Sequence, residues 1–241
     1  MGIRRTLTNP WLDLIPERPF VLPDDEPYIL ELNRYRKNNE SHRIQLDIPP
    51  TPFVGSTVAP LVILLANPGV GQIDKREQTT PAAIREIYAG FQKGRSAPFW
   101  PLSDAFVDTN AGRWWTSKTR ELAAEVGGRH QLAKKMQAIE LHGYHSEKWA
   151  APLTNFPSQG YGFELVRRAM DRDALIIIGR AQSHWYCAVP ELRRYPLHIQ
   201  SLVSIRSAYL SRRNLGTHYG KVLRALGASI NCVSEHHDDD R

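Results

Sequence analysis

A continuous run of five apolar residues at 61–65, LVILL, constrains the fold more than any other part of the sequence. A strand buried on both faces has this pattern, whereas a strand with one face in water alternates apolar and polar residues. Similar strands are predicted at 137–141, 174–179 and 200–205. Helical periodicity separates the strands and predicts a helix beginning at Pro81 and others at 114–126, 163–170 and 212–227. Strands that alternate with helices predict an α/β fold, with a parallel sheet covered by helices on both faces.

The first 55 residues differ from the rest because they are rich in proline, at positions 10, 16, 19, 23, 27, 49, 50 and 52. Proline lacks a backbone donor and restricts the residue before it, so most of this segment should be extended, apart from one short helix at 28–37. We expect an arm, residues 1–55, packed on a single domain of residues 56–230. Its predicted anchors are Trp11, Leu12, Leu14 and Ile15. An acidic, solvated tail is expected at 231–241.

The charge balance favours an anionic partner, because 31 Lys and Arg residues against 25 Asp and Glu residues give a formal net charge of +6. The two cysteines, Cys187 and Cys232, cannot form a four-cysteine zinc or iron–sulfur site, and we expect no metal or other cofactor. Low cysteine use and the lack of a signal-peptide pattern favour a reduced, cytoplasmic monomer. The longest dense apolar run, residues 59–66, is too short to span a bilayer, so no membrane partner is expected.

Ligands of parallel α/β sheets bind beyond the carboxyl ends of the strands, which selects the loops at 66–74, 142–148, 180–184 and 206–213. In the first loop, Gly69 and Gly71 let a ligand approach the backbone closely. Asn67 offers a donor and an acceptor, and Asp74 is the nearest carboxylate. The loop matches neither a Walker A motif nor a dinucleotide fingerprint. A simple strand-ending turn, with Asn67 bonded to its own backbone, is the alternative.

The second loop gathers polar and aromatic groups that suit recognition of a planar ligand, namely His142, Gly143, Tyr144 and His145. Its two histidines lack the partner ligands of a zinc site, so metal binding is not expected. A structural hydrogen-bonding role for His145 is the alternative. The neighbouring Ser146 also permits a hydrolase, although no G-x-S-x-G elbow supports that function.

The last loop combines basic residues with an apolar tip. Basic groups that hold phosphates, around an apolar side chain that enters the base stack, are what base flipping requires. A solvated helix face is the alternative interpretation. The residues predicted to contact DNA here are Arg206, Tyr209, Leu210, Ser211, Arg212 and Arg213.

Taken together, residues 60–228 resemble the uracil-DNA glycosylase superfamily. The sequence LANPG at 65–69 is similar to the G-x-N-P-G motif of its mismatch-specific thymine/uracil branch, and RSAYLS at 206–211 takes the place of its H-P-S-P-L-S loop. The resemblance implies a three-layer α/β/α sandwich around a central four-stranded parallel sheet. It also implies DNA as the partner, Asn67 as the group that positions an attacking water, and Leu210 as the wedge that fills the gap left by a flipped base.

The departures from the family pattern concern the substrate. Leu65 replaces the first glycine of the motif, and Arg206 replaces a histidine that stabilises the departing base in some branches. The arm and an insert at 90–128 have no counterpart in the minimal family. In the uracil-restricted branch a tyrosine closes the pocket against C5 substituents, whereas Gly69 takes that position here and Gly143 leaves further room. We therefore expect release of a C5-substituted pyrimidine, in DNA repair or in defence against modified invader DNA.

The chemistry of base removal gives each candidate a role. The target nucleotide must leave the duplex or already be unpaired, and water attacks a sugar that develops positive charge. Asn67 would hold the water, and Asp74 would act as a base or stabilise the cationic sugar. Arg206 and the backbone amides of 69–71 would meet the charge on the leaving base. The predicted base pocket comprises Pro68, Gly69, Val70, His142, Gly143, Tyr144 and His145.

Three other functions are compatible with the sequence. One is a small-molecule hydrolase that uses Ser146 and His145. Another is a nucleic-acid-binding module without catalysis. The third is a nucleotide or sugar-nucleotide enzyme, against which the lack of a glycine-rich phosphate motif argues. An assay for abasic sites separates the glycosylase from all three.

Overall fold

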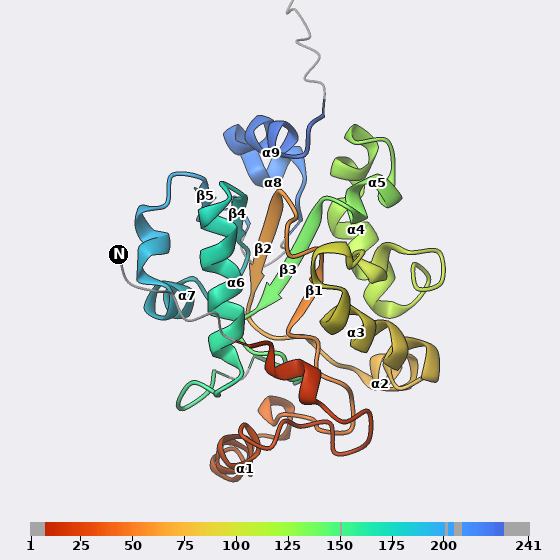
Figure 1. The fold of residues 1–241 in the computed structure, drawn as a ribbon, viewed down its shortest axis with the longest axis vertical. Helices are drawn as coiled ribbons and strands as arrows, with labels where there is room; N and C mark the ends of the chain where they lie inside the picture. Colours follow the sequence, from red (N-terminus) through yellow and green to blue (C-terminus); the bar gives the residue numbers. More distant parts are fainter. Residues whose placement is uncertain (1–7, 150, 201, 205–208, 229–241) are drawn as a thin grey trace, which may run out of the picture.

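The computed structural model describes residues 8–149, 151–200, 202–204 and 209–228. Its centre is a sheet in the order β1-β3-β2-β4-β5 (Figure 1). Strands β2 to β5 run parallel, whereas β1 pairs antiparallel with β3. The predicted α/β class is confirmed, and β1 adds a fifth, antiparallel strand to the four expected from the sequence. The strands are β1 (Phe53–Gly55), β2 (Leu61–Leu65), β3 (Met136–Glu140), β4 (Leu175–Ile178) and β5 (His198–Ile199).

The fourth parallel strand lies earlier in the chain than predicted. β5 pairs with Ile176 and Ile177 of β4 and ends at Ile199. The prediction of a strand at 200–205 is therefore wrong for residues 200 and 202–204, which the structure describes as irregular. Leu202 is nevertheless buried among the apolar side chains of the core. A short apolar run fits a buried loop as well as a strand, which explains the difference.

Helices cover both faces of the sheet, and the alternation along β2 shows how. Val62 and Leu64 belong to one buried cluster, whereas Leu61, Ile63 and Leu65 belong to a second. The first cluster contains residues of α1 (Glu26–Tyr35), α3 (Pro81–Lys93), α6 (Gln159–Asp171) and α7 (Gln182–Ala188). The second contains residues of α4 (Asn110–Glu125), α5 (Arg129–Ala133), α8 (Arg212–Leu215) and α9 (Tyr219–Ala225). The sheet is thus the middle of three layers.

The helices follow their local sequence signals. The helix predicted to begin at Pro81 is confirmed as α3, where the Thr80 hydroxyl accepts the Ala83 N–H at 3.3 Å and caps the first turn. The single helix predicted at 212–227 is wrong, because Gly216 adopts a φ of +54° and divides it into α8 and α9. A further helix, α2 (Gln72–Gln78), follows the loop after β2 and is not predicted by the sequence pattern.

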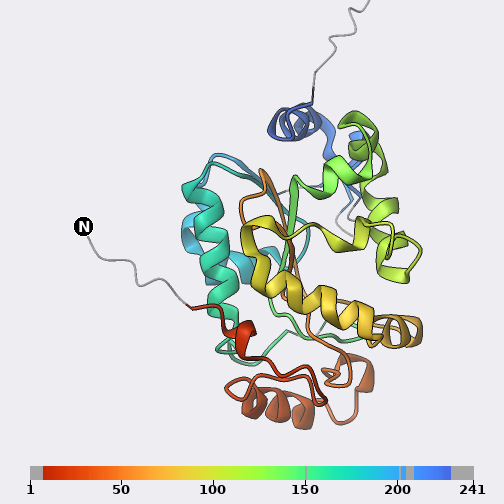
Figure 2. The ribbon, with the colours of Figure 1, turned by 45° about the vertical axis from the view of Figure 1, so that its right-hand side comes forward.

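The proline-rich arm packs against the first buried cluster. Trp11 and Leu14 are buried there, whereas Leu12 and Ile15 are 52% and 66% exposed, so the prediction of anchors is wrong for the latter two. Figures 1 and 2 both show the arm, in red to brown, at the opposite end of the molecule from α9. The predicted tail at 231–241, which includes Cys232, lies outside the described residues.

A buried acid joins the arm to the domain. The Asp25 side chain accepts hydrogen bonds from the Tyr144 hydroxyl at 2.7 Å and from the Ser158 backbone amide at 3.0 Å. The same Tyr144 oxygen accepts the Leu22 N–H at 3.2 Å. These contacts span more than 100 residues of sequence, so the sequence pattern of either segment alone does not reveal them.

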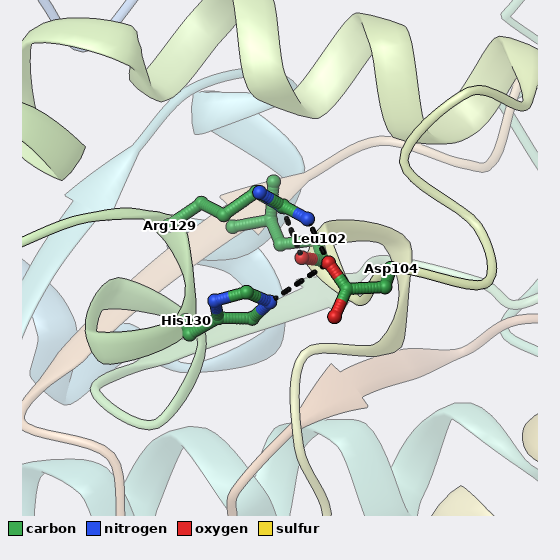
Figure 3. Close-up of polar contacts among 4 residues, drawn as sticks. All are labelled: Leu102, Asp104, Arg129 and His130. Carbon is green, nitrogen blue, oxygen red and sulfur yellow. Dashed lines mark hydrogen bonds and ion pairs between the residues drawn. The ribbon is translucent and has the colours of Figure 1, made fainter.

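The insert packs with both buried clusters, because Trp100 and Phe106 belong to the first and Trp115 to the second. Its Phe99 and Leu102 are fully buried in the second cluster. Arg129, at the start of α5, donates to the Leu102 carbonyl at 3.2 Å and contacts the Asp104 carboxylate, which lies 3.1 Å from Nε2 of His130 (Figure 3). Because Asp104 is largely exposed, these ion pairs add little stability, and apolar burial holds the insert in place.

Candidate active site

A cavity of about 720 Å³ lies at the carboxyl ends of the three central strands. Leu65 ends β2, Glu140 ends β3 and Arg180 follows β4, and all three line it. This is the edge of a parallel sheet at which ligands bind, and the volume suits a small organic group. Six of the residues predicted for catalysis and for the base pocket line the cavity: Asn67, Pro68, Gly69, Val70, Asp74 and His145. Gly71, whose backbone amide has a predicted role, and Ser146, the nucleophile of the hydrolase alternative, line it as well.

Four tryptophans give the cavity flat apolar walls. Three of them belong to the insert, Trp100 before α4 and Trp114 and Trp115 on α4, and Trp149 belongs to the segment after β3. Trp115 meets the ring of Trp114 edge-on, with centroids 4.8 Å apart. Walls of this kind favour a planar ring, which gains contact area on its faces and leaves its polar edge for hydrogen bonds.

Asn67 lies at the cavity wall with its amide orientation fixed by a neighbour. The Ser146 hydroxyl donates its only proton to the Lys148 carbonyl at 2.7 Å, so its oxygen must accept from an N–H group. Nδ2 of Asn67 supplies that N–H at 2.8 Å. The amide oxygen, Oδ1, is therefore directed away from Ser146, and none of the described residues donates to it. It is left to accept a hydrogen bond from a water or a ligand in the cavity.

Asp74 holds two parts of the cavity wall together. Its carboxylate accepts the Gly71 N–H at 2.8 Å, which closes the first turn of α2. It also accepts the side-chain amide of Asn110, at the start of α4, at 2.9 and 3.0 Å. Asp74 thereby joins the loop after β2 to the helix that carries Trp114, and it brings a carboxylate to the wall.

Glu140 and Arg180 provide the strongest polar feature of the cavity. Oε2 of Glu140 is buried and accepts no hydrogen bond within the described part of the chain. Burial raises the pKa of Glu140 to about 8, and attraction to the Arg180 guanidinium offsets this only in part. At neutral pH Glu140 is therefore a neutral carboxylic acid that can donate a hydrogen bond. Arg180 is the one Lys or Arg among the described residues that line the cavity.

No role is predicted from the sequence for Glu140 or for Arg180, although Arg180 begins the loop at 180–184 that the strand pattern selects. The available signals were a charged residue at the end of an otherwise apolar strand and a cation directly after the next buried strand. Ala181, which follows Arg180 and also lines the cavity, has a φ of +53°, a conformation uncommon for a residue other than glycine.

The second loop lines the cavity with His145, Ser146 and Glu147, so the predicted base-pocket positions His142, Gly143 and Tyr144 are wrong. The Tyr144 hydroxyl points into the core toward Asp25, and the His142 ring stacks behind Trp149 at 5.5 Å between centroids. A Cβ added to Gly143 would lie 2.7 Å from Cβ of Pro52, so the arm already occupies the room expected there. The arm therefore covers one side of this loop.

The His145 ring joins the loop after β2 to the arm through two hydrogen bonds. Its Nδ1 donates to the Gly69 carbonyl at 3.1 Å, which leaves Nε2 to accept from the Thr51 hydroxyl at 3.3 Å. Burial lowers the pKa of His145 to about 4, so the ring is neutral at physiological pH. Both ring nitrogens are occupied and the Ser146 proton goes to Lys148, so these two residues do not form the catalytic pair of a hydrolase.

The last loop differs most from its prediction. Leu210 is 2% exposed and packs in the second buried cluster, which does not fit an exposed wedge, whereas Tyr209 is 38% exposed. The Ser211 hydroxyl caps α8 by accepting the Asn214 N–H at 3.2 Å. Arg212 lies 4.5 Å from the Tyr219 ring centroid and pairs with Glu125 at 3.2 Å. Arg213 is exposed, and Arg206 lies outside the described residues.

No protein-family model, curated protein or solved structure matches this chain. Among the described residues, no cluster of three or more His, Cys, Asp and Glu side chains is arranged to hold a metal ion. None of the described helices combines the length and the apolar character that crossing a bilayer requires.

Proposed function

We propose that the protein is a DNA glycosylase, which hydrolyses the N-glycosidic bond of a modified pyrimidine and leaves an abasic site. One observation carries the proposal: a tryptophan-walled cavity at the carboxyl edge of the sheet brings together the pair Glu140 and Arg180 with Asn67, whose amide oxygen accepts no hydrogen bond from the described residues. The partner is DNA, in keeping with the +6 formal charge, and the protein acts as a cytoplasmic monomer.

Asn67 and Asp74 serve the sugar side of the reaction. Oδ1 of Asn67 accepts a hydrogen bond from a water and so holds it for attack on the sugar carbon. The carbon–nitrogen bond breaks with its electron pair leaving on the base, and the sugar becomes positively charged. The carboxylate of Asp74, fixed by Gly71 and Asn110, stabilises that charge from the cavity wall. The water oxygen then bonds to the sugar carbon, and the proton that the water loses ends on the base.

Glu140 and Arg180 serve the base side. A departing pyrimidine carries negative charge on its ring oxygens and nitrogens. The neutral acid of Glu140 donates a hydrogen bond to that charge, and the Arg180 guanidinium attracts it. Arg180 thus takes the role predicted for Arg206 from the sequence, on a residue that the structure describes.

The open position at Gly69 supports a C5-substituted substrate. A Cβ added to Gly69 meets no atom within 4 Å, and the residue lines the cavity. Because Pro52 fills the space beside Gly143, only Gly69 of the two predicted positions leaves room for a C5 group. A pocket without a wall at that position loses its steric rejection of larger bases.

Base release from defined oligonucleotides tests the proposal. Single-stranded and duplex DNAs carrying uracil, thymine, 5-hydroxymethyluracil or 5-hydroxymethylcytosine would be incubated with the protein and then treated with alkali. Strand cleavage at the modified base, absent with Asn67→Ala, is the expected result. Binding of these DNAs without cleavage of any of them would instead indicate a nucleic-acid-binding module, and equal cleavage by Asn67→Ala would remove that residue from the mechanism.

A further inference from the structure

Trp114 belongs both to the cavity and to the outer surface of the protein. It lines the cavity and is also 37% exposed. One helical turn further along α4, the Lys118 ammonium lies 5.5 Å from the Trp114 ring centroid and 3.5 Å from that of Tyr209. Two exposed aromatic side chains therefore flank one cation at the edge of the candidate active site.

Hydrogen bonds hold Tyr209 to both α4 and α8. The Ser117 hydroxyl donates to the Tyr209 hydroxyl at 3.3 Å, and Asn214 donates to the Tyr209 carbonyl at 2.7 Å. The next residue, Leu210, donates its N–H to the Lys118 carbonyl at 2.9 Å and buries its side chain in the core. Leu210 thus anchors the loop that presents Tyr209, and the pre-positioned ring loses little freedom when a ligand stacks on it.

The charge around these rings is positive. Tyr209 has its pKa lowered by the Ser117 hydrogen bond and by nearby Lys118 and Arg120. The acidic residues on the same helix are engaged by α8, because Glu121 accepts the Arg212 backbone N–H at 2.7 Å and Glu125 pairs with the Arg212 side chain. Lys118 and Arg120 therefore attract an approaching anion, whereas Glu121 and Glu125 are held in contacts with α8.

We propose that Trp114, Lys118 and Tyr209 bind unpaired nucleotides that flank the target base in single-stranded DNA, an inference that rests on the proposed glycosylase function. Stacking rings on either side of a cation match a strand in which bases alternate with phosphates. In a duplex each base is stacked between its neighbours, so the rings of Trp114 and Tyr209 can stack on bases only when the strand is unpaired. Because Trp114 also lines the cavity, the bound strand leads directly to the reacting base.

Fluorescence anisotropy with a labelled unmodified single strand, and with its duplex, tests this surface without any need for catalysis. Tyr209→Ala should weaken single-strand binding about tenfold, more than duplex binding, whereas Tyr209→Phe keeps the ring and should bind like the wild type. Lys118→Ala should lower the slope of log affinity against log salt by about 0.7, the contribution of one phosphate on a single strand. Tyr35→Ala and Lys37→Ala, which replace an exposed pair outside the cavity lining, are the matched controls.

The outcomes separate this proposal from the function on which it rests. Unchanged single-strand affinity in Tyr209→Ala, or an equal loss for single strand and duplex, would overturn the stacking surface even if base release is observed. A selective loss with Tyr209→Ala, in a protein that releases no base from any DNA, would support the surface and reject the glycosylase. Thermal unfolding of each variant at the wild-type temperature excludes misfolding as the cause of a loss.

Discussion

Nδ2 of Asn67 donates to the Ser146 hydroxyl at 2.8 Å, and this one contact decides which end of the Asn67 amide faces the cavity. Ser146 can only accept this bond, because its own proton goes to the Lys148 carbonyl. The serine that suggested a hydrolase nucleophile thus acts through Asn67, as a positioning residue. The contact also links two strand-following loops that are 79 residues apart in sequence.

Asn67→Ala should lower the rate of base release about 100-fold or more, because it removes the amide oxygen that holds the attacking water. DNA affinity should stay close to that of the wild type, since no phosphate contact is lost. Single-turnover cleavage and anisotropy on the same oligonucleotide measure the two effects. An equal loss in both would mean that Asn67 binds the substrate rather than the water.

Ser146→Ala should have a smaller effect of the same kind. The alanine leaves the Asn67 amide free to rotate, and loss of one hydrogen bond of about 1 kcal/mol predicts a fall in kcat of about five- to tenfold with little change in KM. Ser146→Thr, which keeps a hydroxyl, is the matched control. If Ser146→Ala instead abolished activity as completely as Asn67→Ala, Ser146 would have to take part in the chemistry itself.

Glu140→Gln tests the neutral acid in the cavity. The wild-type acid donates a hydrogen bond only when protonated, so base release should fall as the pH rises through about 8, the raised pKa of Glu140. The glutamine amide donates at every pH, so the variant should keep activity at neutral pH and lose this alkaline decline. Rates measured from pH 6 to 10 give the two profiles. An alkaline decline that persists unchanged in Glu140→Gln would assign it to another group.

The parts of this site that the sequence predicts are those set by local order along the chain. Burial on both faces leaves a continuous apolar run at β2, and Asn67 and Asp74 follow it directly, so both the strand and its loop are visible. The four tryptophan walls come from three separate segments, and only the tertiary fold brings them together. Local sequence patterns therefore predict which edge of the sheet carries the site, but they do not predict which side chains enclose the cavity.

The residues misassigned from the sequence fail for a related reason. Tyr144 and Leu210 look like exposed functional side chains because each stands among polar neighbours. Tyr144 is covered by the arm through Asp25, and Leu210 fills a space in the core beside α4. What covers a side chain comes from a distant part of the chain, so burial of a single loop residue cannot be deduced from its neighbours.

His145 should make the protein less stable in acid. Its pKa is about 4 in the folded state against an ordinary value of 6.5, so the unfolded chain takes up a proton that the folded protein does not bind as the pH falls through this window. The lost stability reaches about 3 kcal/mol near pH 4 and is absent above pH 7. Glu140 acts in the opposite direction. Its pKa is raised from 4.5 to about 8 in the folded protein, so its contribution to stability is lost as the pH rises from about 4.5 to about 8. Urea unfolding of the wild type and of His145→Gln at pH 7.5 and 5 isolates the histidine, because only the difference between the two proteins should depend on it.

Gly69→Tyr should convert the proposed substrate range from broad to narrow. Gly69 lines the cavity and its missing side chain leaves open space, so a large ring built there would stand against any group at C5 of a bound pyrimidine. Release of uracil should be retained, whereas release of 5-hydroxymethyluracil should fall about tenfold or more, because a steric clash acts on the larger base alone. Competition between the two bases in otherwise identical single strands gives the ratio of kcat/KM directly. Gly69→Ala, too small to reach the C5 group, should keep the wild-type ratio. If Gly69→Tyr slowed both bases equally, the open position would not be the one that faces C5, and another wall of the cavity would have to set the choice of base.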